Sequence, residues 1–171
     1  MPRPAPTEFG PFYTDYIALV PENDILPAMA SQLDEMLALL RSVSEAESMV
    51  RHAPYTWSTK EVVGHLIDGE RIFTYRALRF AREDATPLPS FDENPYVTSG
   101  AFDRLPLAAL VEEFDMVRRA SLALFRNLPA EAWNRRGVAN KAEISVNAVA
   151  YIVVGHVRHH GGILRKRHGR A

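Results

Sequence analysis

The stretch that decides the fold is SVNAVAYIVVGHVRHHGGILRKR, residues 145–167, near the end of the chain. Ser145 is a good helix N-cap and no proline follows it in this stretch, so we expect a helix over 146–167. The apolar residues recur at spacings of three and four, which places them on one face of that helix. They are Val149, Ile152, Val153 and Ile163. A helix with one apolar face must pack against other helices, which favours a bundle.

Two histidines lie within this apolar stripe. At about 100° per residue, His156 and His160 point with the apolar side chains, whereas His159 lies at the edge of the stripe and Arg158 on the opposite face. Two imidazoles spaced i, i+4 can bind one metal ion, because both side chains reach a common centre. A histidine pair can equally be an ordinary pair of buried polar residues. The spacing alone leaves both interpretations open.

Three more segments have helical periodicity. We expect helices at about 24–43, 58–83 and 106–127, each with a continuous apolar face. Ser58 followed by Glu61 is a capping box that predicts the start of the second helix. Four helices of this length predict an all-α fold, a four-helix bundle, formed as a single domain over residues 1–171.

The connections between these helices differ in length. Residues 84–103, DATPLPSFDENPYVTSGAFD, contain three prolines and one glycine and predict a long loop between the second and third helices, of the kind that often covers a binding site. Residues 1–12 contain four prolines and predict an extended N-terminal arm. Residues 135–146 predict a turn or a short extended piece, and no segment shows convincing strand alternation.

Composition excludes several classes of function. The chain of 171 residues is 47% hydrophobic and 24% charged, with a net charge of −1 and no cysteine. The absence of cysteine excludes disulfides, thiolate ligands and cysteine nucleophiles. The charge balance gives no reason to expect a nucleic acid or a membrane as partner. With no apolar run long enough to span a membrane and no signal peptide visible, we expect a cytoplasmic protein with a small-molecule substrate.

A metal site needs a third ligand from a facing helix, and His65 is the candidate. Its direction on the second helix lies about 80° from the centre of the apolar stripe, at the shoulder of the buried face. That position suits a solvent-reachable cleft, and it suits a surface histidine equally well. His52 lies in a predicted connection and His168 lies among cations at the end of the chain, so neither is a comparable candidate.

With these residues assembled, the chain resembles the DinB-like (DinB/YfiT) superfamily of four-helix proteins. The resemblance is carried by WSTKEVVGHLIDGERIFTYRALRFAR (57–82), PLPSFDENPYV (87–97) and SVNAVAYIVVGHVRHHGGIL (145–164). Members commonly bind a divalent metal through one histidine on the second helix and an H-x-x-x-H pair on the last. By that resemblance, the metal ligands here are His65, His156 and His160, in agreement with the angular argument.

The resemblance implies a range of activities. Some relatives are metal-dependent S-transferases or isomerases that use a low-molecular-weight thiol, and others are described as hydrolases. Zinc and nickel are the expected metals, while iron and manganese also fit three imidazoles. We expect a transferase or hydrolase, because three histidines leave open coordination positions; the alternative is a non-catalytic metal- or ligand-binding bundle. Bundles of this kind often pair, so a homodimer is expected.

Candidate catalytic residues accompany the histidines. Asp68, three residues after His65, is a candidate to support a ligand or to be a fourth one, although a solvated helix carboxylate fits equally. Arg76 lies three turns beyond His65 on the same side and could hold a substrate carboxylate.

Asp92 is a further catalytic candidate, on the long loop that could cover the site. The other polar residues of this loop are Glu93, Asn94 and Tyr96. Glu61 is the other carboxylate near His65, and the capping box already occupies it. The aromatic residues of the arm more simply pack against the bundle: Phe12, Tyr13 and Tyr16.

Overall fold

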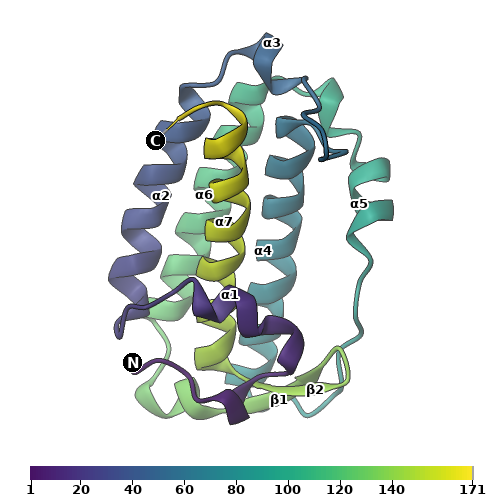
Figure 1. Cartoon of the computed structure of the whole chain (residues 1–171). Coiled ribbons are helices and arrows are strands. Elements are labelled where there is room, and N and C mark those ends of the chain that lie inside the picture. Colours follow the sequence, from purple (N-terminus) through teal and green to yellow (C-terminus); the bar gives the residue numbers. More distant parts are fainter. Residues whose placement is uncertain (171) are drawn as a thin grey trace.

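The computed structural model describes residues 1–170, in which four long helices form a bundle (Figure 1). They are α2 (Ile25–Arg41), α4 (Thr59–Ala81), α6 (Leu107–Arg126) and α7 (Val146–Arg167). The prediction of an all-α four-helix bundle is confirmed. Each long helix begins and ends within one or two residues of the predicted bounds, because capping residues and apolar periodicity were both visible in the sequence.

Side-chain caps fix the starts of the two helices that carry the histidines. Ser58 Oγ accepts a hydrogen bond from the Glu61 N–H at 3.1 Å, and the Glu61 carboxylate accepts one from the Ser58 N–H at 2.7 Å. This is the predicted capping box of α4. At the start of α7, Ser145 Oγ accepts from the Ala148 N–H at 2.9 Å.

Helices α4 and α6 run in the same direction, so the chain between them must travel back along the whole bundle (Figure 1). The predicted long connection is present, but its description as a loop is wrong, because it contains α5 (Glu93–Gly100) and a 3₁₀ turn, η3 (Phe102–Arg104). The buried side chains of Val97 and Phe102 hold these elements against the bundle. The Phe102 ring lies on α4 at Gly64, where a Cβ would come within 2.3 Å of it.

The N-terminal segment is folded, not extended as predicted. Two 3₁₀ turns, η1 (Pro6–Glu8) and η2 (Pro11–Tyr13), precede a short helix, α1 (Thr14–Ala18). Each turn has a proline in its first position, where the missing N–H costs nothing. Helix α1 crosses α7 (Figure 1) and meets it at Gly155, where a Cβ would lie 2.1 Å from the carbonyl oxygen of Tyr16. The short α3 (Glu45–Ser48) connects α2 to α4.

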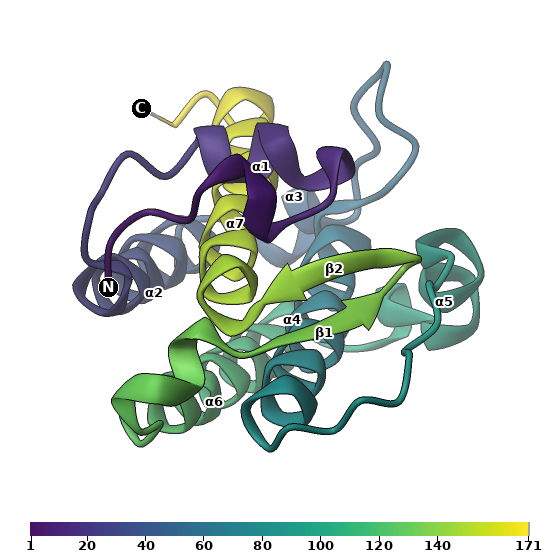
Figure 2. The same ribbon diagram turned by 90° about the horizontal axis from the view of Figure 1, so that it is seen from below.

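A small hairpin closes one end of the bundle between η4 (Ala130–Asn134) and α7. Strands β1 (Arg136–Ala139) and β2 (Ala142–Ser145) pair antiparallel through a two-residue turn. Both turn residues, Asn140 and Lys141, have positive φ values of 52° and 62°, as the hairpin-forming type I′ turn requires. The predicted short extended piece is therefore a hairpin. Figure 2 shows it crossing the end of the bundle beside α4 and α7.

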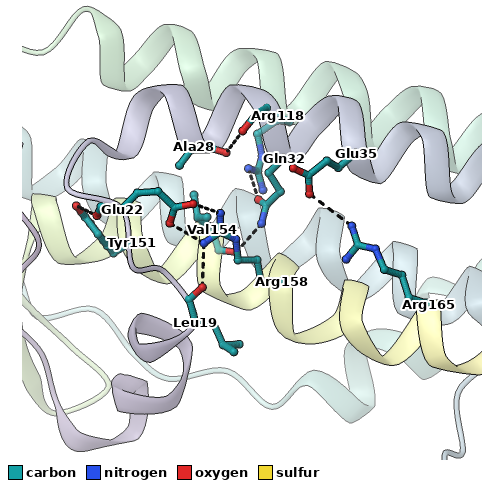
Figure 3. A network of polar contacts seen from close by, with 11 residues as sticks. Leu19, Glu22, Ala28, Gln32, Glu35, Arg118, Tyr151, Val154, Arg158 and Arg165 are labelled. Carbon is teal, nitrogen blue, oxygen red and sulfur yellow. Dashed lines mark hydrogen bonds and ion pairs between the residues drawn. The ribbon is translucent and has the colours of Figure 1, made fainter. Parts of the chain in front are cut away.

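The core consists of two apolar clusters with a polar layer between them. The guanidinium Nε of Arg118, in α6, lies 2.8 and 3.0 Å from the two carboxylate oxygens of Glu70, in α4. Its Nη1 donates to the side-chain oxygen of Gln32, in α2, and Gln32 donates to the carbonyl oxygen of Val154, in α7, both at 2.8 Å (Figure 3). One chain of contacts thus joins all four long helices.

Candidate metal centre

The three predicted metal ligands come together where α4 faces α7. His65 lies in the second turn of α4, and His156 and His160 lie one turn apart on α7. Their ring centroids are 4.8 to 4.9 Å from one another, and one nitrogen from each ring lies within 4.8 Å of those of the other two. The Nε2 atoms of His65 and His156 are 2.9 Å apart. The angular argument predicted that His156 and His160 point inward, and they do; it left a cleft or a surface position open for His65, and the structure brings His65 into the cluster.

Gly69 makes room for one of these rings. It follows His65 by one turn on α4, and a Cβ at this position would lie 3.0 Å from Cε1 of His156. A larger residue would push the imidazole away from the other two, because α4 cannot retreat from α7 without disturbing the core between them. The sequence pattern His-x-x-x-Gly on α4 thus provides both one histidine of the cluster and the space for the ring of another.

Burial keeps all three imidazoles neutral. It lowers the pKa of His65 to about 4 and the pKa of His160 to about 3. Burial also lowers the pKa of His156 well below its usual value, and the neighbouring His160 and His65 add to that effect. A neutral imidazole has a free lone pair on one nitrogen, which is the form that binds a metal ion. At neutral pH the cluster is therefore a set of three ready nitrogen donors.

The donor set fits a divalent transition metal. Three neutral nitrogens around one centre are the protein ligands of many catalytic zinc sites, in which the fourth position holds water or substrate. Zinc–nitrogen bonds of about 2.0–2.1 Å in tetrahedral geometry separate the nitrogens by about 3.3 Å. The 2.9 Å between His65 Nε2 and His156 Nε2 is close to that separation. Imidazole ligands also suit nickel, iron and copper, so the set does not select one metal.

The cluster forms one wall of a cavity of about 290 Å³. Helices α4 and α7, the N-terminal segment, the chain leading to α5 and the hairpin turn all contribute to its lining. Besides the three histidines, the lining residues are Phe12, Tyr13, Tyr16, Trp57, Phe73, Arg76, Ser90, Phe91, Glu93, Asn140 and His159. Aromatic side chains predominate among them. Rings that exclude water from a metal centre strengthen the electrostatic interactions inside it.

Arg76 is the buried cation of this cavity. It is only 4% exposed, and its Nη2 donates to the carbonyl oxygen of Pro89 at 2.8 Å. The guanidinium carbon lies 5.9 Å from the ring centroids of both Phe73 and Phe91. The sequence placed Arg76 on the side of α4 that carries His65, and the structure brings both residues into the same cavity.

The acidic residue that reaches the cavity is Glu93, not Asp92. The side chain of Asp92 caps α5 by accepting a hydrogen bond from the Asn94 N–H at 3.0 Å, and it is absent from the cavity lining. Glu93 is the first residue of α5 and lines the cavity. Burial raises the pKa of Tyr16, and the Glu93 carboxylate raises it further. Glu93 and Tyr16 therefore lie close enough to influence each other.

The other two carboxylates near His65 have different surroundings. Asp68 does not line the cavity; burial raises its pKa, and its charged neighbours are Arg71 and Glu113, on the side of α4 that faces α6. Glu61 is engaged in the capping box and in an ion pair with Arg51 at 2.9 Å. Within residues 1–170, neither carboxylate hydrogen-bonds to a histidine of the cluster.

Several lining residues were not singled out from the sequence as part of the site. Trp57 covers His65, with ring centroids 5.0 Å apart, and makes this shoulder histidine a buried one. Phe91 and Asn140 arrive from the chain before α5 and from the hairpin turn. The polar loop and the turn-forming Asn140 were visible in the sequence, but their distance from the histidines depends on tertiary packing.

Comparison with known proteins identifies the family. A model of the DinB superfamily matches residues 28–164, which is most of the chain and includes all three clustered histidines. The protein belongs to the DinB superfamily. No curated protein matches the sequence.

Solved structures share the fold at low sequence identity. YfiT from Bacillus subtilis, described as a probable metal-dependent hydrolase with an unusual four-helix bundle topology, is 18% identical with a TM-score of 0.72, over 85% of this chain and 89% of YfiT. A mycothiol-dependent maleylpyruvate isomerase is 14% identical with a TM-score of 0.71, over 82% of this chain and 59% of the isomerase. Among residues 1–170, no helix is long and apolar enough to cross a membrane.

Proposed function

We propose that the protein is a metal-dependent enzyme that acts on a small molecule, with a divalent ion held by His65, His156 and His160. The observation that carries this proposal is the convergence of three neutral imidazoles, two buried and His160 half-buried, on the wall of one cavity. A structural metal site has a closed shell of four protein ligands. The cluster found in residues 1–170 has three, which leaves coordination positions for water or substrate and favours catalysis over a purely structural role.

The chemistry of the proposed site follows from its donors. When bound, a divalent ion with three neutral ligands acts as a Lewis acid and lowers the pKa of a coordinated water or thiol. Activated water would make the protein a hydrolase, and an activated thiol would make it an S-transferase. The chain contains no cysteine, so a thiol would come from a low-molecular-weight cofactor. The description of YfiT as a probable metal-dependent hydrolase is compatible with the first reaction. The mycothiol dependence of the isomerase is compatible with the use of a small thiol in the second.

Other residues around the histidines would contribute to the proposed reaction. Glu93 and Tyr16 line the same cavity as the histidines, and in this proposal they would accept or donate a proton. Arg76 provides positive charge at the cavity wall, while Trp57 and Phe73 exclude water on either side of the cluster. The alternative is a non-catalytic protein that binds a metal or a ligand in the same cavity without turnover.

Metal content tests the first step of the proposal. We expect untagged protein, refilled with zinc or nickel, to contain about one ion per chain by ICP-MS, and His65→Ala and His156→Ala each to contain almost none. His159→Ala is the matched control, because His159 lines the cavity but does not belong to the cluster. Stoichiometry near zero in refilled wild-type protein, or equal retention in all three variants, would contradict the site.

Turnover tests the second step. Metal-loaded protein should hydrolyse small esters or amides, or transfer a small thiol to an electrophilic substrate, in a screen of both reaction types. The His156→Ala variant should lose the activity that the wild type shows. A protein that binds one ion per chain and shows no turnover in either screen would support the non-catalytic alternative.

A further inference from the structure

Arg76 is a buried charge without an acidic partner. The comparison with Arg118 makes this clear: Arg118 is also buried, but it lies against the carboxylate of Glu70. Among residues 1–170, no carboxylate forms an ion pair with Arg76, although it is only 4% exposed. Removing a charge from water without a counter-charge is costly, so an unpaired guanidinium on a cavity wall points to a ligand that supplies the opposite charge.

The groups that hold Arg76 in place are neutral. Its Nη2 donates to the carbonyl oxygen of Pro89 at 2.8 Å, and its Nη1 lies 3.4 Å from the hydroxyl oxygen of Tyr13. The rings of Phe73 and Phe91 flank the guanidinium, each with its centroid 5.9 Å from the central carbon. A guanidinium has five N–H donors, and these contacts occupy only two of them, so this lining residue of the cavity keeps donors for a ligand.

The position of Arg76 relates it to the histidine cluster. Both Arg76 and His65 project from one side of α4, and both line the same cavity. The ring of Phe73 lies near both groups: its centroid is 5.9 Å from the guanidinium carbon of Arg76 and 5.5 Å from the ring centroid of His156. A molecule with an anionic group at Arg76 and a short body along Phe73 would therefore place its far end at the histidines.

We propose that Arg76 is the anchor for a substrate carboxylate, and that the cavity takes a small acid with an apolar, unsaturated or aromatic body. A planar guanidinium matches the two oxygens of a carboxylate, and the aromatic lining suits the body of such an acid. The volume of about 290 Å³ limits the ligand to a small molecule. Placing the reacting group at the histidines rests on the proposed function, whereas carboxylate binding by Arg76 does not.

Benzoate and its neutral isostere benzamide are the probes for this proposal. Their dissociation constants would be measured by ligand-observed NMR on the full chain, in EDTA-treated and in zinc-loaded form. We expect benzoate to bind both forms at least tenfold more tightly than benzamide. Arg76→Met should weaken benzoate binding at least tenfold, to the level of benzamide. Arg71→Met is the matched control and should bind like the wild type, because Arg71 is exposed on the same helix outside the cavity and pairs with Glu113.

The outcomes separate this proposal from the proposed function. Equal binding of benzoate and benzamide to wild-type protein would overturn it, and this comparison does not depend on the folding of any variant. Benzoate binding that needs zinc and is unchanged in Arg76→Met would also overturn it, since the acid would then be a metal ligand and the metal site would stand. Binding that depends on Arg76 in a protein that takes up no metal would support the anchor and remove the metal-dependent function.

Discussion

At the scale of single residues, one glycine sets the approach of the N-terminal segment to the histidine cluster. Gly155 lies next to His156 on α7, and α1 crosses the helix at that point. A Cβ on residue 155 would lie 2.1 Å from the carbonyl oxygen of Tyr16, and the ring of Tyr16 packs against His156 with centroids 5.4 Å apart. The close approach of backbone to backbone is what allows this tyrosine to cover the histidine.

We expect Gly155→Ala to destabilise the protein by about 1–3 kcal/mol. The added methyl group would overlap backbone atoms of Tyr16, which cannot rotate away as a side chain can. Gly162→Ala is the matched control on the same helix. A Cβ on residue 162 would meet no neighbouring segment within 4 Å, so this substitution should stabilise the protein by roughly 0.5–1 kcal/mol through better helix propensity. Urea unfolding of metal-free protein measures both. Equal stabilities of the two variants would show that α1 does not rest on α7 at Gly155.

Helix geometry predicts two members of the histidine cluster from the sequence, whereas His65 was assigned to it through the family resemblance. The i, i+4 spacing within an apolar stripe places His156 and His160 on the buried face whatever the neighbouring helix is. The candidate carboxylates were harder to judge. Asp68 lies only three residues from His65, yet its charged neighbours are on the side facing α6. Which residue of the long connection reaches the cavity, Glu93 and not Asp92, depends on where α5 begins.

At the scale of elements, a charged contact attaches the segment after α1 to the side of α7. Arg158 donates to both carboxylate oxygens of Glu22, at 2.5 and 2.7 Å, and its Nη1 also lies 2.9 Å from the carbonyl oxygen of Leu19 (Figure 3). The hydrogen bonds from Arg158 hold the pKa of Glu22 below its usual value of 4.5. The N-terminal segment is therefore held at its far end by charge and at Gly155 by close packing.

This contact predicts a pH-dependent effect of Glu22→Gln. A carboxyl group whose pKa is lower in the folded state stabilises it above the unfolded pKa, and the stabilisation is lost as the pH falls through the folded value. We therefore expect the variant to melt about 2–4 °C below the wild type at pH 7, for a loss of up to about 1 kcal/mol in a partly exposed pair. The difference should shrink as the pH falls below 4.5.

Thermal unfolding of metal-free protein from pH 3 to pH 7 measures this effect without interference from metal release. The exposed Glu131→Gln serves as the control and should show no comparable trend. A difference between Glu22→Gln and the wild type that stays constant over this pH range would show that the pair with Arg158 does not stabilise the folded state.

The long helices were predictable as elements, and the short ones were not, for a physical reason. Helix α4 has a capping box and an apolar stripe in its own sequence, so local signals suffice. Helix α5 has two prolines before it and only one buried residue, Val97, and it is held by the packing of the following Phe102 on Gly64. The hairpin is likewise supported by the pairing of Leu88 with Ala139, a contact between distant segments.

At the scale of the whole molecule, the polar layer divides the core and joins the helices. Gln32 lies between Met29 of one apolar cluster and Leu33 of the other. Glu70 and Arg118 occupy the equivalent level on α4 and α6, and both are almost fully buried. Sliding α4 or α6 along its axis would leave Glu70 or Arg118 buried and unpaired, and sliding α2 would break the hydrogen bonds of Gln32, so the layer favours one register of the bundle. The histidines of α4 and α7 lie together in the register that this layer holds.

A double-mutant cycle on Glu70 and Arg118 tests this role. Glu70→Leu and Arg118→Met should each lower the free energy of unfolding by about 3–5 kcal/mol, because each leaves the opposite charge buried and alone. The double variant should lose much less than the sum, since no charge remains in the layer. Its recovery should be partial, because the side-chain oxygen of Gln32 loses the Arg118 donor, at a cost of about 1–3 kcal/mol.

Urea unfolding of the metal-free proteins gives the four free energies of the cycle, and Arg71→Met provides the matched control. The pair of Arg71 with Glu113 joins the same two helices but is exposed, so its loss should cost less than about 1 kcal/mol. Additive effects of the two buried substitutions would show that Glu70 and Arg118 do not depend on each other. Zinc uptake by the double variant then separates stability from register: a stable bundle that has lost the metal would mean that the polar layer is what aligns His65 with His156 and His160.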